Sequence, residues 1–170
     1  MTTFFIVFAL HWYLSLFSQT FFLHRYAAHA MFRMNPFWEK FFYIFTWLTQ
    51  GSSYLSPYAY GILHRLHHAY TDTENDPHSP SYTKGLFPLM WKTKQIYGDI
   101  NKDVLKVDDK FMKNLPMWRS FDRFASSYGI RIGWGVVYFL FYLTFATHWW
   151  MWLLFPITCL MGPTHGAIIN

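Results

Sequence analysis

Residues 4–23 read FFIVFALHWYLSLFSQTFFL, and this stretch decides the class of fold. It contains no charged side chain, and as an α-helix it would be about 30 Å long, which matches the hydrocarbon thickness of a membrane. A cleaved signal peptide would have a basic N-terminal region and small residues before a cleavage site, and neither is present. We therefore predict a transmembrane helix here.

The charged residues are confined to the middle of the chain. Of its 170 residues 53% are hydrophobic, 24% are aromatic and 14% are charged, a composition that argues against a soluble or a disordered protein. Every Lys, Arg, Asp and Glu lies between Arg25 and Arg131. The uncharged residues 132–170 would form a helix about 58 Å long, nearly two membrane thicknesses. We predict a hairpin of two crossings, with its turn at residues 147–150, where two Trp residues favour the membrane interface.

The remaining segments complete the predicted topology. Residues 37–63 are aromatic but interrupted by polar residues, Gly51 and Pro57, so we expect them to lie at the interface or against other helices. Residues 84–131 hold 10 of the 14 basic residues and are predicted to be cytoplasmic. The expected fold is one all-α integral membrane domain over residues 1–170, with about three transmembrane helices plus interfacial helices. Nucleic acid is not an expected partner, because acidic residues alternate with the basic ones.

Five of the nine histidines form two clusters directly after apolar segments. His24 and His29 stand in HRYAAH, and His64, His67 and His68 stand in HRLHH. The spacing of the second cluster puts three imidazoles on one face of a helix, where they can converge on one or two metal ions. His24 and His29 are about 140° apart on a regular helix, so sharing a metal requires a helix end or a local distortion.

The type of metal follows from the ligands. The sequence contains neither Cys-rich zinc spacing nor an HExxH motif, whereas many imidazoles with few carboxylates suit iron or copper that reacts with oxygen. Asp72 and Asp76 follow in TDTENDPH; their carboxylates can accept the second N–H of a ligating imidazole, and an exposed turn is an equal interpretation. His78 is expected to be structural or to support the ligands. We interpret His11 and His148 as hydrogen-bonded interfacial side chains.

Together these residues resemble the membrane-bound fatty acid desaturases, particularly the stearoyl or Δ9 type. HRYAAH resembles the first histidine box of that family, HxxxxH, and HRLHH resembles the second, HxxHH. The continuation YTDTENDPHSP, residues 70–80, is similar to the stretch that follows the second box. The resemblance runs from about residue 14 to the last residue.

The resemblance implies a fatty acyl desaturase that uses O₂ and two irons to insert a double bond into a saturated acyl chain. By this analogy His24, His29, His64, His67 and His68 are iron ligands on the cytoplasmic side of the membrane. The substrate would be an acyl-CoA or an acyl-lipid, and electrons would come from a b-type cytochrome or a ferredoxin. The basic residues 84–113 would steer such an acidic donor, or the acyl-CoA head group, toward the site.

The sequence departs from the family at its C-terminal end. The family has a third HxxHH box after the hairpin and one more histidine shortly after an Asn, and Asn170 is the last residue here. We therefore expect the third box to lie outside this sequence, with Asn170 supporting the metal through water, and the 170 residues alone to bind metal incompletely. His165 could substitute for a ligand, but a ligand inside the hydrocarbon is costly, so we interpret it as a packing residue.

Three alternatives remain open at this level. A hydroxylase of the same two-iron superfamily would have the same boxes and would produce an alcohol instead of an alkene. A haem carrier would use His11, His148 or His165 as axial ligands and would show a Soret band. A fragment that retains the boxes without the chemistry would bind well below one iron per chain.

Overall fold

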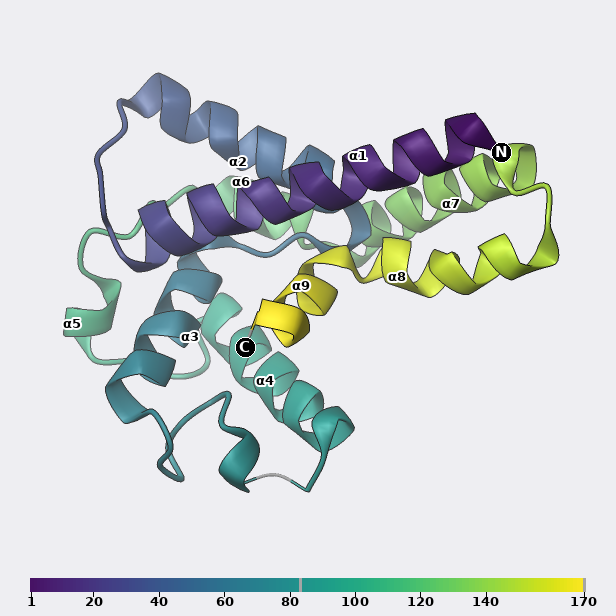
Figure 1. Ribbon diagram of the computed structural model, residues 1–170. Helices are drawn as coiled ribbons and strands as arrows, with labels where there is room; N and C mark the ends of the chain where they lie inside the picture. The colour runs from purple at the N-terminus through teal and green to yellow at the C-terminus, as the bar shows by residue number, and fades with distance from the viewer. Residues whose placement is uncertain (83, 170) are drawn as a thin grey trace. The chain divides into compact units, whose positions relative to one another are not determined.

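The computed structural model describes residues 1–82 and 84–169, and over these residues the chain is helical and contains no strand (Figure 1). The all-α class predicted from the sequence is confirmed. The chain forms two compact units, each made from separate stretches of sequence. The first unit comprises Met1–Phe21, Met34–Leu55 and Trp118–Asn170, and the second comprises Phe22–Arg33 and Ser56–Met117. A single domain over residues 1–170 stays a prediction.

The helices of the first unit include the long apolar ones. They are α1 (Thr2–Ser18), α2 (Pro36–Gln50), the short 3₁₀ turn η2 (Gly51–Ser53), α6 (Arg119–Ala125), α7 (Tyr128–Phe145), the 3₁₀ helix η4 (Trp149–Leu154), α8 (Phe155–Cys159) and α9 (Met161–Ile169). The second unit contains α3 (Pro57–Tyr70), η3 (Pro80–Tyr82), α4 (Leu86–Asn101) and α5 (Asp109–Met112). A π-helix, η1 (Gln19–Ala28), begins in the first unit and continues into the second.

Two continuous helical stretches of the described chain are long and apolar enough to cross a membrane. They are Thr2–Ala28, which contains the predicted span of residues 4–23, and Tyr128–Phe145. Only Phe4, Ser15 and Ser18 of α1 are buried, so most of its apolar side chains point outward. An outward-facing apolar surface is typical of a helix whose solvent is lipid.

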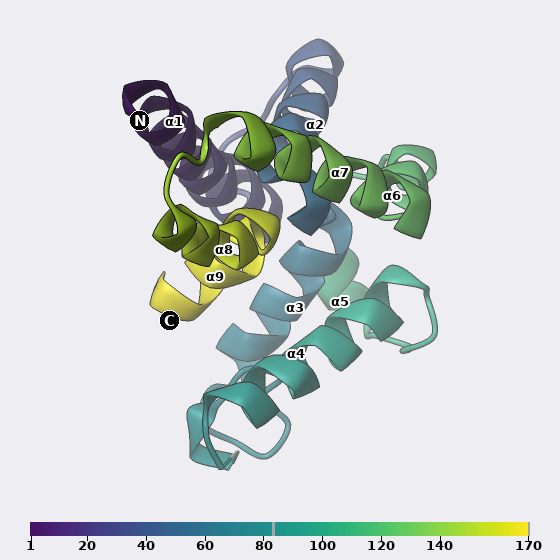
Figure 2. The ribbon, with the colours of Figure 1, turned by 90° about the vertical axis from the view of Figure 1, so that its right-hand side faces the viewer.

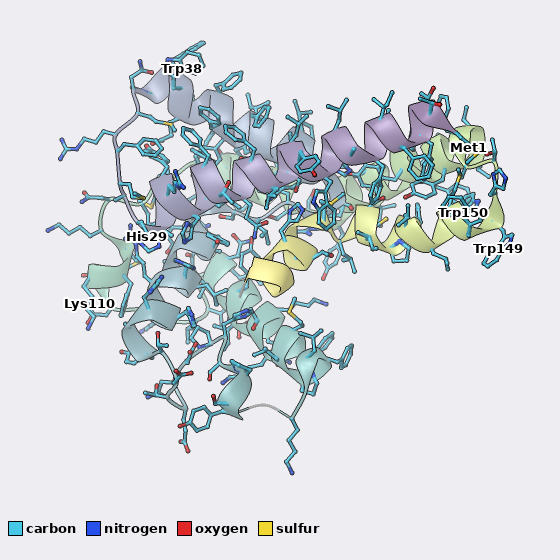
Figure 3. The ribbon with its side chains drawn as sticks, viewed as in Figure 1. Met1, His29, Trp38, Lys110, Trp149 and Trp150 are labelled. Atoms are coloured by element: carbon cyan, nitrogen blue, oxygen red, sulfur yellow. The ribbon has the colours of Figure 1, made fainter. Side chains whose placement is uncertain are left out.

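The predicted hairpin is present, but its second arm is broken. Helix α7 ends at Phe145 and η4 begins at Trp149, so the turn falls where the sequence placed it. Figure 3 shows Trp149 and Trp150 at the same end of the first unit as Met1. The second arm then consists of three short helices instead of a third continuous crossing. Pro156 and Pro163 explain the breaks, because proline cannot donate the backbone hydrogen bond that a continuous helix requires.

The predicted interruption of residues 37–63 lies between α2 and α3. At Gly51 the backbone has a positive φ of 52°, and a Cβ there would collide with the Tyr138 hydroxyl. Only glycine fits such a position without strain. Arg131 then secures the chain that follows, since its guanidinium donates to the carbonyls of Ser52 at 2.9 Å and Tyr54 at 3.0 Å. The interruption is therefore an ordered turn that Gly51 permits and Arg131 stabilises.

The second unit is organised around α3 and α4, which pack side by side (Figure 2). Ser56 caps α3 by accepting a hydrogen bond from the Ala59 N–H at 3.3 Å, and Pro57 occupies the first turn. Serine as N-cap followed by proline is a favourable helix start. The core between these helices contains Tyr58, Ala59, Ile62, Ile100 and Leu115. This core fixes α3, which carries the second histidine box.

Candidate metal centre

The first histidine box lies at the end of the π-helix η1. The His29 N–H donates to the carbonyl of His24 at 3.0 Å, which is the i to i+5 bond that defines a π-helix. Because the turn is wider than in an α-helix, residues five apart return to nearly the same face. The distortion that the spacing of His24 and His29 required is thus present in the backbone, and their imidazole Nε2 atoms are 3.1 Å apart.

Four imidazoles from the two boxes converge within the second unit. The Nε2 of His64 lies 3.0 Å from that of His29 and 2.9 Å from that of His68. Ligand atoms of His24, His29 and His64 all lie within 4.8 Å of one another, and this trio is a group that can hold a metal ion. The labelled His29 marks this cluster in Figure 3. We refer to His24, His29, His64 and His68 as the histidine cluster.

The distances within the histidine cluster suit a shared cation better than hydrogen bonds. A neutral Nε2 has either one N–H or one lone pair in the ring plane, so the central nitrogen of His64 cannot satisfy two neighbouring nitrogens at once. Two nitrogens bound at right angles, each about 2.1 Å from one ion, would be about 3.0 Å apart. The spacing of the His24, His29 and His64 nitrogens therefore matches that of neighbouring ligands around one metal, and His68 lies beside His64.

The protonation state also suits metal binding. Burial, reinforced by the neighbouring imidazoles of the cluster, lowers the pKa of His64 to about 3. Burial and the charges of His68 and Arg65 lower the pKa of His29. A neutral imidazole is the form that ligates metals, and His64 is neutral throughout the physiological range.

His67 is held away from the cluster by a buried carboxylate. Its Nδ1 lies 2.9 and 3.0 Å from the two oxygens of Asp76, while its ring centroid is 6.4 Å from that of His64. A carboxylate at Nδ1 fixes the tautomer with the proton there and leaves Nε2 as the free lone pair. The three imidazoles of HRLHH therefore do not converge on a single point. His64 and His68 join the first box, and His67 faces separately.

Asp76 is the organising residue of the loop after α3. It is fully buried and accepts backbone hydrogen bonds from His78 at 2.8 Å and Asp72 at 3.2 Å. Burial raises the pKa of its carboxyl, but the hydrogen bonds from His67 and from these N–H groups lower it below the ordinary value. Of the two interpretations of TDTENDPH, the structure supports the carboxylate that orients an imidazole for Asp76. Asp72 contributes only its backbone N–H, at a positive φ of 59°.

The Asp76 loop is secured against α4. The Lys92 ammonium donates to the Asp76 carbonyl at 3.2 Å, and the Thr93 hydroxyl donates to the Pro77 carbonyl at 3.0 Å. The ring Nδ1 of His78 lies 2.9 Å from the same hydroxyl. His78 is thereby held between the loop and α4, and its support of a metal ligand stays a prediction.

Sequence reasoning gave no role to Arg65, which lies inside the second box. Its guanidinium donates to the carbonyls of Ala27 at 3.0 Å and Ala28 at 2.7 Å, at the end of η1. It also donates to the carbonyls of Phe111 at 3.0 Å and Lys113 at 2.7 Å. Arg65 therefore joins the segment that carries the first box to the helix that carries the second. In the sequence, the feature that distinguishes this arginine is its position between the histidines of the second box.

The other histidines have partners in the first unit. The His11 Nε2 lies 3.2 Å from the Tyr138 hydroxyl, and the His148 Nδ1 lies 3.0 Å from the hydroxyl of Thr147. His165 is buried, 3.4 Å from the Ser15 hydroxyl and edge-on to Trp12. These contacts fit hydrogen-bonded and packing roles. Asn170 lies outside the described residues.

The Asp76→Asn variant is expected to bind iron about 10- to 100-fold more weakly than the parent protein, because a neutral amide oxygen stabilises the Nδ1 proton of His67 less than the carboxylate does. The measurement is an anaerobic Fe(II) titration of the purified protein. Asp72→Asn is the matched control, since the side chain of Asp72 is exposed and the loop uses its backbone N–H. Equal iron affinity in the two variants would contradict the role given to Asp76.

Comparison with known proteins supplies independent information. The family model described as fatty acid desaturase matches residues 2–168. A curated acyl-CoA C20 Δ5-desaturase of Anemone leveillei is 38% identical over 79 residues, which cover 46% of this chain and 24% of that protein. A Δ9 acyl-lipid desaturase of Arabidopsis thaliana is 36% identical over 70 residues, 40% of this chain and 21% of that protein. The matched segments thus span less than a quarter of each relative. No solved structure matches significantly.

Proposed function

Since this chain belongs to the fatty acid desaturase family, we propose that it takes part in inserting a double bond into a fatty acyl chain at a histidine-ligated iron centre. The observation that carries this proposal is the convergence of the His29, His64 and His68 Nε2 atoms at 2.9 to 3.0 Å. The proposed ligands are His24, His29, His64, His67 and His68, with Asp76 and His78 in support.

The donor set fits iron that reacts with O₂. Imidazole nitrogens predominate, and the one buried carboxylate beside them bonds to a ligand ring. Bound iron would supply the activation of O₂ that the removal of hydrogens from unactivated methylenes requires. The separate orientation of His67 is compatible with two irons, one at the histidine cluster and one near His67.

The overall reaction sets what the protein has to provide. Two adjacent methylenes lose two hydrogens and become an alkene, and O₂ is reduced to two waters. The substrate supplies two electrons and two protons, so two further electrons and two protons come from an external donor and from solvent. The residues of this chain hold the imidazoles in place: Asp76 bonds to Nδ1 of His67, and Arg65 joins the two boxes.

The family is membrane-bound, and two helices of this chain are apolar enough to cross a membrane. We infer a multi-pass protein whose histidine boxes and basic residues 84–131 are on the cytoplasmic side, in accord with the positive-inside rule. Within this topology the substrate is an acyl-CoA or an acyl-lipid. The names of the two relatives include one of each kind.

The electron donor is proposed to be a small acidic protein, a b-type cytochrome or a ferredoxin, attracted by the lysines of residues 84–113. Reversing the charge of Lys102, Lys106 and Lys110 to Glu is expected to slow donor-dependent turnover roughly 10-fold or more at low salt and to flatten its dependence on ionic strength. Turnover with a small chemical reductant is expected to stay unchanged and serves as the control. Unchanged rates and salt dependence with the protein donor would remove this role.

The proposed function is tested by product analysis, in lipid nanodiscs, of the purified protein with the expected third histidine box included. Fe(II), O₂, a reductant and either a saturated acyl-CoA or a phospholipid with the same acyl chain are supplied, and the acyl products are identified by mass spectrometry. An alkene that forms with the parent protein and is lost in His64→Gln is the expected result. An alcohol would indicate a hydroxylase, a Soret band a haem carrier, and iron far below one per chain an inactive fragment.

A further inference from the structure

Helix α4 has an outward face that no described residue of the second unit covers. Leu86, Phe87 and Trp91 near its beginning are 64%, 78% and 50% exposed, and Tyr82 just before the helix is also exposed. Phe87 and Trp91 are one turn apart and their rings stack with centroids 6.4 Å apart. Exposed apolar side chains that cluster in this way mark a site of contact with a membrane or with another protein.

The opposite face of α4 is engaged. Leu89 and Ile100 are buried, and Ile96 and Tyr97 pack on the core formed with α3. Figure 2 shows α4 lying along α3. The same face also holds the Asp76 loop through Lys92 and Thr93. The helix is therefore fixed in the second unit, and its aromatic end is presented outward.

The charges around the exposed aromatic residues are of one sign. Residues 77–98 contain Lys84, Lys92 and Lys94 and no acidic residue, whereas residues 99–109 contain four Asp. The Lys94 ammonium lies 4.5 Å from the centroid of the Trp91 ring, and both Lys84 and Lys94 are exposed. Aromatic rings beside lysines whose stems lie on apolar surface are the combination that binds at a membrane interface.

We propose that the first half of α4, from Leu86 to Lys94, docks on the surface of a bilayer. Phe87 and Trp91 insert at the level of the head groups, and Lys84 and Lys94 bind anionic lipid phosphates. The occupant is the bilayer, because the patch joins exposed aromatic side chains to lysines with no acidic residue between them. The lysines tested for the electron donor, Lys102, Lys106 and Lys110, lie farther along the chain, among acidic residues. The docked helix would hold the Asp76 loop, and with it His67, at a fixed depth below the membrane surface.

The test measures the depth of single spin labels in the full chain. In a Cys159→Ser background, which removes the only cysteine, a label is attached at Phe87→Cys or, as a matched site on the same helix, at Asp99→Cys. The proteins are placed in nanodiscs of phosphatidylcholine with or without phosphatidylglycerol. Collision rates with O₂, which concentrates in lipid, and with a water-soluble nickel chelate are then measured by electron paramagnetic resonance.

We expect the ratio of O₂ to chelate collisions to be several-fold higher at position 87 than at position 99, and to rise further with phosphatidylglycerol. In Lys84→Gln/Lys94→Gln the increase with anionic lipid should be lost. High chelate access at position 87 would mean that the helix lies in water, and exclusion of both reagents would mean that protein covers it; either result overturns the proposal. A label at Leu86→Cys repeats the measurement if Phe87→Cys fails to fold. None of these readouts requires iron or turnover, so they are independent of the proposed desaturation.

Discussion

The His64→Gln variant is expected to lose its iron, with an affinity for Fe(II) lowered by more than about 100-fold. His64 is the centre of the histidine cluster, since its Nε2 makes two of the three short nitrogen contacts, to His29 and to His68. Glutamine keeps a polar side chain of similar reach but has no imidazole lone pair. The measurements are the iron content of the purified protein and an anaerobic Fe(II) titration.

The matched control is His148→Gln, because His148 is exposed and its ring lies beside the neighbouring Thr147, far along the chain from both histidine boxes. It is expected to bind iron as the parent protein does. His68→Ala should resemble His64→Gln, and His67→Ala should also lose iron if His67 ligates through its free Nε2. Full iron content in His64→Gln, with a normally folded protein, would refute the ligand assignment.

Arg65→Met is expected to lower the free energy of unfolding of the protein by at least about 3 kcal/mol and to weaken iron binding at the same time. The side chain of methionine fills a similar volume but leaves four backbone carbonyls without their donor, two at the end of η1 and two at the C-terminal end of α5. Because these carbonyls are on different segments, losing the hydrogen bonds to them also loosens the first box relative to α3. Thermal unfolding followed by circular dichroism measures the first effect, and Fe(II) titration measures the second.

Arg65→Lys separates charge from geometry. A lysine keeps the positive charge, but a single ammonium cannot reach carbonyls on both segments, so only partial recovery of stability and of iron affinity is expected. Arg25→Met is the control, since Arg25 is an exposed arginine in the same unit. If Arg65→Met and Arg25→Met unfolded at the same temperature, the guanidinium would have no structural role.

The sequence predicted those features that depend on side-chain chemistry along one element. The apolar run of residues 4–23, the turn before Trp149 and the interruption at Gly51 were visible as composition and are confirmed as helices and breaks. The i, i+3, i+4 spacing correctly predicted that the second box lies on one helix, α3. These patterns can be predicted because, in a regular helix, the spacing of residues along the sequence determines which side of the helix their side chains occupy.

What could not be predicted depends on contacts between elements. The separate orientation of His67 follows from the buried Asp76, and no helical spacing reports which imidazole a distant carboxylate will hold. The role of Arg65 depends on carbonyls 37 to 48 residues away. The sequence indicated that the first box needed a distortion, but the π-helix itself is a pattern of backbone bonds that leaves no side-chain signature. The second arm of the hairpin is apolar in composition, yet two prolines break it into short helices.

The π-helix also determines how the first box can vary in length. An α-helix brings residues four apart onto one face, and a π-helix does the same for residues five apart. The pair His24 and His29 is therefore equivalent to an ordinary i, i+4 pair into which one residue has been inserted, with the extra residue absorbed by the wider turn. The wider turn thus accommodates a five-residue spacing that in an α-helix would rotate one imidazole away from the other.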